Sequence, residues 1–316
     1  MPVSAPVGAP SNQQAPKLSA AMNDAVQDRI AERRGEEAIG IILIDAGFAV
    51  NDRATKILDF HDGANQDRDE TIDAGVAMAE DIGRIGAGLG MEVISGSGAI
   101  DRLGGAAAQH AGRGAAVLLI ADPFLAQAGL DEPARRSLGD AGLAVFRFTE
   151  IRSDPTAEQI DRAADEIRRT GARLVVGLGG GSALDVAKLA AAVAAADAPA
   201  EAYALMARPL PAGALPVVAL PTTAGTGSEA TRTAVYTLSS GVKAWAWGDE
   251  LRPKAAILDP ALTVGLPPSL TAATGVDALV HAIEAATNNR QDPIAEARAL
   301  EAIRLVAAHL PDAVAR

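Results

Sequence analysis

The sequence contains no cysteine, which excludes disulfide bonds and thiolate chemistry. Positive charge is scarce: 28 Lys and Arg face 40 Asp and Glu, and the formal net charge is −12. Nucleic acids and anionic membrane surfaces are bound through basic patches, so this balance argues against both as partners. Long hydrophobic runs are missing too, because the best N-terminal run, residues 38–50, is interrupted by Asp45. The first residues lack the basic start and apolar core of a secretion signal, and we expect a cytoplasmic protein.

A glycine-rich loop follows the apolar run at residues 174–178. It reads Gly179-Gly180-Gly181-Ser182, with Asp185 three residues further on. Glycines let the backbone approach a phosphate closely, and the N-terminus of a following helix offers N–H groups and a positive dipole end. Ser182 and Asp185 also fit a helix-capping arrangement. The pattern predicts an anion site, and the alternative is an ordinary tight turn between strand and helix.

A second polar loop follows another apolar run, at residues 215–220. It supplies hydroxyl and backbone donors on a flexible frame, which suit phosphate, ribose or a carboxamide. Its candidate binding residues are Thr222, Thr223, Thr226 and Ser228. The alternative is a polar surface loop. Two donor-rich loops, each after an apolar strand, are what an open α/β sheet uses to hold a nucleotide.

A third motif places Asp277 and His281 four residues apart. On a helix this spacing puts both side chains on one face, one turn apart. A carboxylate and an imidazole so placed can both ligate a divalent metal, and the alternative is a surface helix pair.

Taken together, the three motifs resemble the iron-dependent (group III) alcohol dehydrogenase family. In this sequence they read Gly-Gly-Gly-Ser-x-x-Asp-x-Ala-Lys, Pro-Thr-Thr-Ala-Gly-Thr-Gly-Ser-Glu and Gly-x-Asp-Ala-Leu-x-His-Ala-Ile-Glu-Ala. The resemblance begins near residue 97 and runs to the C-terminus. It implies an NAD(P)- and metal-dependent alcohol dehydrogenase or aldehyde reductase that transfers hydride between a nicotinamide and a small alcohol or aldehyde. Fe²⁺ is the implied metal, with Zn²⁺ as the alternative.

The resemblance also assigns roles to single residues. Asp122 matches the family position that contacts the adenosine ribose, where a carboxylate favours NAD over NADP. Lys243 matches a lysine near the cofactor, and Asp277 and His281 match the first two metal ligands, at the catalytic centre. The alternatives are a turn or cap residue before Pro123 for Asp122 and a solvated hairpin charge for Lys243.

The fold class expected from these patterns is α/β. Repeated strand and helix stretches from residue 115 indicate a parallel sheet wrapped by helices. We predict strands at 116–120, 143–148 and 174–178, helices at 125–142 and 157–170, and a hairpin at 234–247. The predicted domains are an extra, partly disordered N-terminal segment (1–93), a Rossmann-like dinucleotide-binding domain (94–266) and an incomplete all-helical metal-binding domain (267–316). Apolar residues of the last segment need a partner surface, so we expect self-association into a homo-oligomer.

The family uses one Asp and three His as ligands, and the last two histidines lie well beyond the Asp277 helix. The histidines of this chain are His61, His110, His281 and His309, and none of the other three fits those positions. Two hypotheses follow: a dehydrogenase whose helical domain is cut short, or a catalytically inactive nucleotide-binding remnant. A weaker alternative is another reaction on the same scaffold, as in glycerol dehydrogenase, maleylacetate reductase or a dehydroquinate-synthase-like lyase.

Overall fold

A computed structural model describes residues 88, 90–289 and 292–315. All of them lie in the second of the chain's two units, Gln66–Arg316. The segment predicted as an extra N-terminal part falls almost wholly outside the described residues. None of the helices in the described part is long and apolar enough to cross a membrane.

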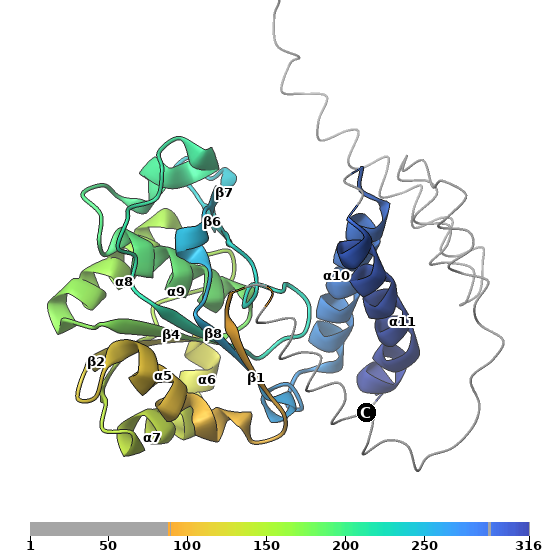
Figure 1. The fold of residues 1–316 in the computed structure, drawn as a ribbon, viewed down its shortest axis with the longest axis horizontal. Helices are drawn as coiled ribbons and strands as arrows, with labels where there is room; N and C mark the ends of the chain where they lie inside the picture. Colours follow the sequence, from red (N-terminus) through yellow and green to blue (C-terminus); the bar gives the residue numbers. More distant parts are fainter. Residues whose placement is uncertain (1–87, 89, 290–291, 316) are drawn as a thin grey trace, which may run out of the picture. The chain divides into compact units, whose positions relative to one another are not determined.

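The described chain begins with a parallel α/β domain (Figure 1). Its strands are β1 (Glu92–Ser95), β2 (Ala116–Ala121), β3 (Ala144–Phe148), β4 (Leu174–Gly179), β5 (Val217–Pro221) and β8 (Ala255–Leu258). Its helices are α5 (Leu103–Ala111), α6 (Pro123–Gln127), α7 (Glu132–Asp140), α8 (Ala157–Thr170) and α9 (Gly181–Val193). Short 3-10 helices lie at η2 (Ala99–Arg102), η3 (Ala200–Met206), η4 (Asp249–Leu251) and η5 (Pro260–Leu262).

The sheet has six strands in the order β1-β8-β5-β4-β2-β3, all in parallel register with their neighbours. From β2 the chain goes outward to the edge strand β3 and then returns to the other side of β2 to form β4. The strand order therefore reverses between β2 and β4. In open α/β sheets, ligands bind at the carboxyl ends of the strands beside such a reversal.

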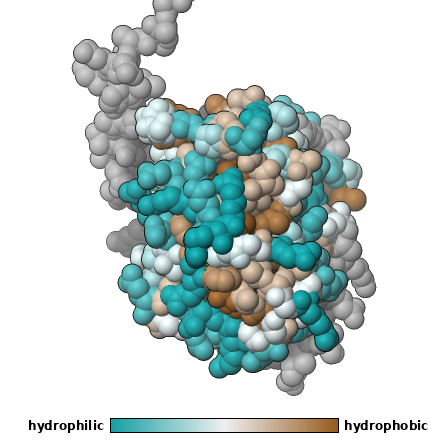
Figure 2. Space-filling model, turned by 90° about the vertical axis from the view of Figure 1, so that its left-hand side faces the viewer, coloured by the Kyte–Doolittle hydropathy of each residue, from teal (hydrophilic) through white to brown (hydrophobic). Residues whose placement is uncertain are grey.

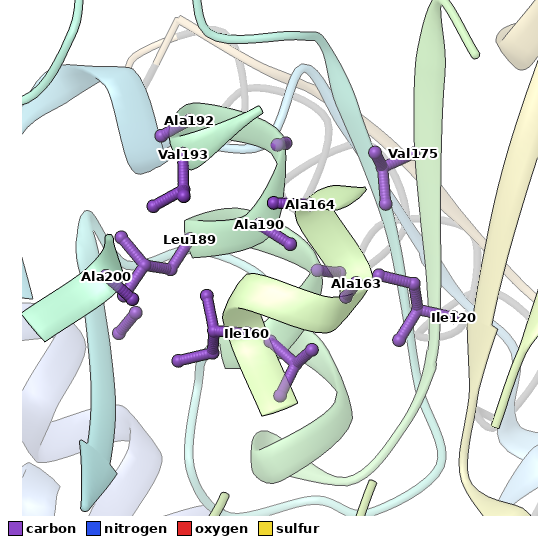
Figure 3. Packing of buried hydrophobic residues seen from close by; sticks show 14 of the residues in the cluster. Ile120, Ile160, Ala163, Ala164, Val175, Leu189, Ala190, Ala192, Val193 and Ala200 are labelled. Carbon is purple, nitrogen blue, oxygen red and sulfur yellow. The ribbon is translucent and has the colours of Figure 1, made fainter. Parts of the chain in front are cut away.

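Two hydrophobic layers cover the sheet, because alternate residues of a strand point to opposite faces. Leu118 and Ile120 of β2 belong to the cluster under α8 and α9, and Val117 and Leu119 belong to the cluster under α5 and α7. Figure 1 shows α8 and α9 on one face and α5 and α7 on the other. Figure 3 shows the first cluster, in which Ile160 of α8 packs beside Leu189 of α9. The prediction of a parallel sheet wrapped by helices is confirmed.

A separate antiparallel hairpin, β6 (Thr233–Thr237) with β7 (Lys243–Trp247), confirms the predicted hairpin. Its turn contains Gly241 at φ +80°, a backbone region that favours glycine. One face of the hairpin packs on the α8–α9 layer through Ala234, Tyr236, Ala244 and Ala246. The outer surface of the described chain mixes hydrophilic residues with smaller hydrophobic areas on the face in Figure 2.

The predicted single helix over 125–142 is wrong, because the structure has two helices, α6 and α7, in this region. Gly129 adopts φ +72° between them, which a continuing right-handed helix does not allow. Pro133 then stands at the start of α7, where its missing N–H costs no helical hydrogen bond.

The chain ends in two helices, α10 (Pro268–Thr287) and α11 (Pro293–Ala315). They approach closely at Gly275, where an added Cβ would lie within 3 Å of the Leu310 side chain. Few of their residues are buried, namely Gly275, Ala282 and Ala299. Apolar side chains such as Val276, Val280 and Ile294 stay at least 40% exposed. The expectation of an all-helical segment after residue 267 is met within the described residues, although the domain boundary itself stays a prediction.

Candidate functional site

The carboxyl ends of β2, β4 and β5 bring three chain segments together. Beyond the last strand residues, the Asp122 amide donates to the Leu178 carbonyl (3.0 Å), and the Thr222 amide donates to the Gly179 carbonyl (3.0 Å). The sheet's hydrogen bonding thus continues into the loops that carry the predicted residues. Asp122, the glycine-rich loop and Thr222 at the start of the second loop lie side by side at the point where the strand order reverses.

The first loop is packed so tightly that only glycine fits at its start. Gly179 has φ +149°, and a Cβ there would lie 2.8 Å from the Ala183 Cβ and 3.2 Å from the Asp122 Cβ. Gly180 forms the N-cap of α9, and no side chain caps this helix end. The helix therefore presents a positive dipole end that no side chain caps, which is the arrangement of an anion site.

The side chains of the second loop lie against the first loop. A Cβ on Gly180 would lie 3.5 Å from Thr223, and one on Gly181 would lie 2.8 Å from the Cγ2 atom of Thr226. Thr223 and Thr226 therefore bring hydroxyl groups to the N-terminal end of α9. Thr222 is buried, and the Thr226 hydroxyl accepts from the Ser228 amide (3.3 Å). The structure brings the predicted donors together, and their contact with a cofactor stays a prediction.

Asp122 plays a second role that is visible in the structure. Its Oδ1 accepts from the Phe124 amide (2.8 Å), so this side chain caps α6, and Pro123 occupies the first position of that helix. The cap holds the carboxylate at the end of β2, beside Gly179. The position of Asp122 is therefore compatible with both interpretations made from the sequence, a cap residue and a contact with the ribose.

The predicted capping role of Ser182 and Asp185 is wrong. The N-cap is Gly180, and Ser182 lies inside the helix. Asp185 turns toward the second loop: its Oδ1 accepts from the Ser228 hydroxyl (2.6 Å), and its Oδ2 accepts from the Val235 amide (3.0 Å). The carboxylate forms these long-range bonds because β6 and the second loop pack on the side of α9, which the local sequence does not reveal.

The site prediction did not include two charged residues beside the second loop: Lys188, which is buried, and Glu229, which is partly buried. Burial lowers the pKa of Lys188, and the nearby Asp185 opposes that shift. Burial also raises the pKa of Glu229, against the influence of Lys188. A signal was present in the sequence, because Lys188 stands inside the alanine-rich run of α9, where a charge is unexpected.

Lys243 lies at the start of β7 and is exposed. Its Nζ is 2.6 Å from Oδ1 of Asp154, which is also exposed. This is the arrangement expected of a solvated hairpin charge, and a role beside the cofactor stays a prediction.

Asp277 and His281 lie on α10, as expected. Oδ2 of Asp277 and Nδ1 of His281 are 3.8 Å apart, and both side chains are about half exposed. The helix is near the second loop, because a Cβ on Gly225 would lie 2.5 Å from the Thr274 carbonyl oxygen. Within the described residues, however, no group of three or more His, Asp or Glu side chains is placed to hold a metal ion. These two residues alone do not fit a resident iron or zinc ion, which needs more ligands.

Comparison with known proteins gives matches to the α/β domain and to the two C-terminal helices. The model of the iron-containing alcohol dehydrogenase family matches residues 91–260, and the model of the C-terminal part of that family matches residues 271–316. Long-chain-alcohol dehydrogenase 1 of Geobacillus thermodenitrificans is 39% identical over 201 residues, which are 63% of this chain and 51% of that enzyme. NAD-dependent methanol dehydrogenase of Bacillus methanolicus is 38% identical over 226 residues, 70% of this chain and 58% of that enzyme.

A solved structure is similar as well. Sulfoacetaldehyde reductase from Bifidobacterium kashiwanohense, in complex with NAD⁺, superposes with a TM-score of 0.68 at 34% identity. The match covers 72% of this chain and 60% of that one. The chain spans about half the length of the curated relatives it matches.

Proposed function

The chain belongs to the iron-containing alcohol dehydrogenase family, and on that basis we propose that its α/β domain binds a nicotinamide dinucleotide. The observation that supports this best is the pair of facing loops at the ends of β4 and β5. The N-terminal end of α9 suits a phosphate, and Thr223 and Thr226 add hydroxyl donors beside it. A bound nicotinamide would exchange a hydride with a small alcohol or aldehyde, the substrate class that we propose.

We further propose that NAD(H) is preferred over NADP(H). Asp122 stands at the end of β2, one strand from the glycine loop, and its carboxylate is fixed by the cap to Phe124. A carboxylate at this place accepts a hydrogen bond from a ribose 2′-hydroxyl and repels a 2′-phosphate. The residue that begins α6 would thus also discriminate between the two cofactors.

The test is a fluorescence titration with NADH and with NADPH. Wild-type protein should saturate with NADH at a lower concentration than with NADPH. Asp122→Asn keeps an N-cap of equal quality but removes the charge, so the preference should shrink while the stability stays near that of wild type. An unchanged preference would remove Asp122 from the site, and the absence of saturation by either cofactor would refute the proposed binding.

Metal chemistry stands apart from this proposal. If iron or zinc binds, Asp277 and His281 would supply the ligands from α10, and the ion would polarise a substrate oxygen. Two ligands do not close a coordination sphere, so these two residues alone do not hold a catalytic ion.

A second candidate function is dinucleotide binding without turnover. The observation in its favour is that the described residues hold no cluster of three ligands. Assays of alcohol oxidation with added Fe²⁺ or Zn²⁺ separate the two candidates: saturation with NADH but background turnover supports the binding protein. Association into a homo-oligomer stays a prediction, supported by the exposed apolar side chains of α10 and α11 and checked by light scattering.

A further inference from the structure

Lys188 lies in the middle of α9 and is completely buried. Its neighbours in the chain, Leu189 and Ala190, belong to the hydrophobic cluster shown in Figure 3. An ammonium group in such surroundings is costly unless oxygen atoms replace its hydration shell. The partners of Lys188 therefore show what this charge does in the fold.

The Lys188 ammonium binds oxygen atoms at the end of the second loop and just beyond it in the chain. Its Nζ donates to the Ser228 carbonyl (2.9 Å), to the Thr231 hydroxyl (3.2 Å) and to the Thr233 carbonyl. These residues run from the end of the second loop to the start of β6. One side chain of α9 thus holds a stretch of chain that lies 40 to 45 positions away in the sequence.

Asp185, one turn before Lys188, completes the arrangement. Its Oδ1 lies 3.1 Å from the Lys188 Nζ and accepts from the Ser228 hydroxyl (2.6 Å). Ser228 is therefore held through its carbonyl by one residue and through its hydroxyl by the other. The other end of the loop is fixed as well, by the Thr222 amide on the Gly179 carbonyl.

We propose that Lys188 is a positioning residue for the dinucleotide site, which fixes the Thr222–Ser228 loop against the N-terminal end of α9. The inference rests on the proposed function. The donors of the two loops must keep a set spacing to bind one ligand together. Lys188 maintains that spacing because its ammonium group holds the end of the second loop. Asp185 and Ser228 then act through the same network and need no direct contact with the cofactor.

A simpler interpretation is a buried ion pair that only stabilises the domain. The two interpretations assign the effect of Lys188 to different contacts, either to the ion pair with Asp185 or to the hydrogen bonds with two backbone carbonyls. The contact with Asp185 lies within one helix, whereas the bonds to the two carbonyls join the helix to Ser228 of the loop and to Thr233 at the start of β6. Removing both charges separates these contributions.

The first experiment compares NADH affinity with stability in Lys188→Met, which keeps the length of the side chain and removes its donors. We expect the dissociation constant to rise by about tenfold or more, because hydrogen bonds from a charged group are lost at the loop. The matched control is Tyr236→Phe, which removes a buried hydrogen bond to the Ala200 carbonyl (2.9 Å) in the same layer. It should lower the free energy of unfolding and leave the dissociation constant unchanged.

The double variant Asp185→Asn with Lys188→Met removes both charges. If the ion pair alone mattered, this variant would regain stability and NADH affinity together, and the proposal would be overturned. We expect stability to recover in part while the affinity stays weak.

Amide hydrogen exchange without NADH tests the network independently of cofactor binding. In Lys188→Met, exchange at residues 222–228 should rise relative to strand β2, and Tyr236→Phe should not show this difference. Equal exchange at the loop in the two variants would overturn the positioning role. If Lys188→Met does not fold, Ser228→Ala removes the hydroxyl bond to Asp185 and should raise the same loop exchange. If wild type does not bind NADH, the proposed function fails, and the exchange data still decide the role of Lys188.

Discussion

Gly180 offers the most direct test of the proposed phosphate site, because here a side chain can be added without disturbing the fold. Its backbone dihedral angles, φ −73° and ψ −177°, are open to any residue. The nearest atoms to an added Cβ are Cγ2 and Oγ1 of Thr223, both at 3.5 Å, which is ordinary van der Waals contact. Gly180→Ala should therefore fold normally.

The expected effects on stability nearly cancel. Replacing glycine at a compatible position stabilises a protein by about 0.4–1 kcal/mol through the unfolded chain. Alanine is a poorer N-cap than glycine, which costs a similar amount. We expect the free energy of unfolding to stay within about 1 kcal/mol of wild type.

The effect on NADH binding should be larger. The methyl group would stand between the end of α9 and Thr223, where a phosphate must approach the backbone. Losing one hydrogen bond to a charged group costs about 1.5–3 kcal/mol, which raises the dissociation constant roughly 10- to 100-fold. NADH fluorescence titration measures it, with urea unfolding as the check on stability.

Gly105→Ala is the matched control, because a Cβ added at this position in the first turn of α5 meets no atom within 4 Å. It should gain up to about 1 kcal/mol from helix propensity and bind NADH like wild type. Should folded Gly180→Ala titrate with NADH as wild type does, the phosphate would not lie at this helix end.

Three further outcomes are expected. Gly177→Ala places a Cβ 2.9 Å from that of Ala187 and should lower the free energy of unfolding in urea by about 1–3 kcal/mol; no loss would mean that β4 and α9 separate easily. Burial raises the pKa of Tyr236 to about 12, so stability should be intact below pH 10 and decline from pH 10 to 12. Tyr236→Phe should flatten this decline, and an identical slope in the thermal midpoint would contradict it. His281→Ala should change stability by less than about 0.5 kcal/mol, because its pair with Asp277 is exposed, and calorimetry should detect only weak Zn²⁺ binding in wild type. Tight binding that His281→Ala abolishes would show a more complete metal site.

Local patterns in the sequence predicted most of the α/β domain. Strands β2, β3 and β4 begin and end within one residue of the predicted ranges, and α8 spans the predicted 157–170. The helix is well marked because Thr156 and Gln159 form a capping box and Gly171 ends it in the left-handed conformation. These signals are local, and so a single sequence contains them.

The errors in the candidate site arose where residues distant in the sequence determine the contacts. The local sequence placed Asp185 in a capping pattern. Its actual partners, Ser228 and Val235, are 43 and 50 positions away, so the local sequence does not reveal them. The motif that contains Lys188 likewise does not reveal its partners, because Ser228 and Thr233 are 40 and 45 positions away. The positions of the two loops followed from strand order, whereas the network that connects them depends on how β6 packs against α9.

The pairing of β1 with β8 has a consequence for the order in which the domain assembles. Glu92 is opposite Ala255 in the register, and Asp259 accepts hydrogen bonds from the Gly98 and Ile100 amides. Among the described strands, the first to be synthesised is therefore paired only with the last. Contacts of such long sequence separation form slowly, because a large loop must close before they form. During synthesis, β1 remains without its sheet partner until residues 255–259 have left the ribosome, and in that interval its backbone groups are open to pairing with another chain.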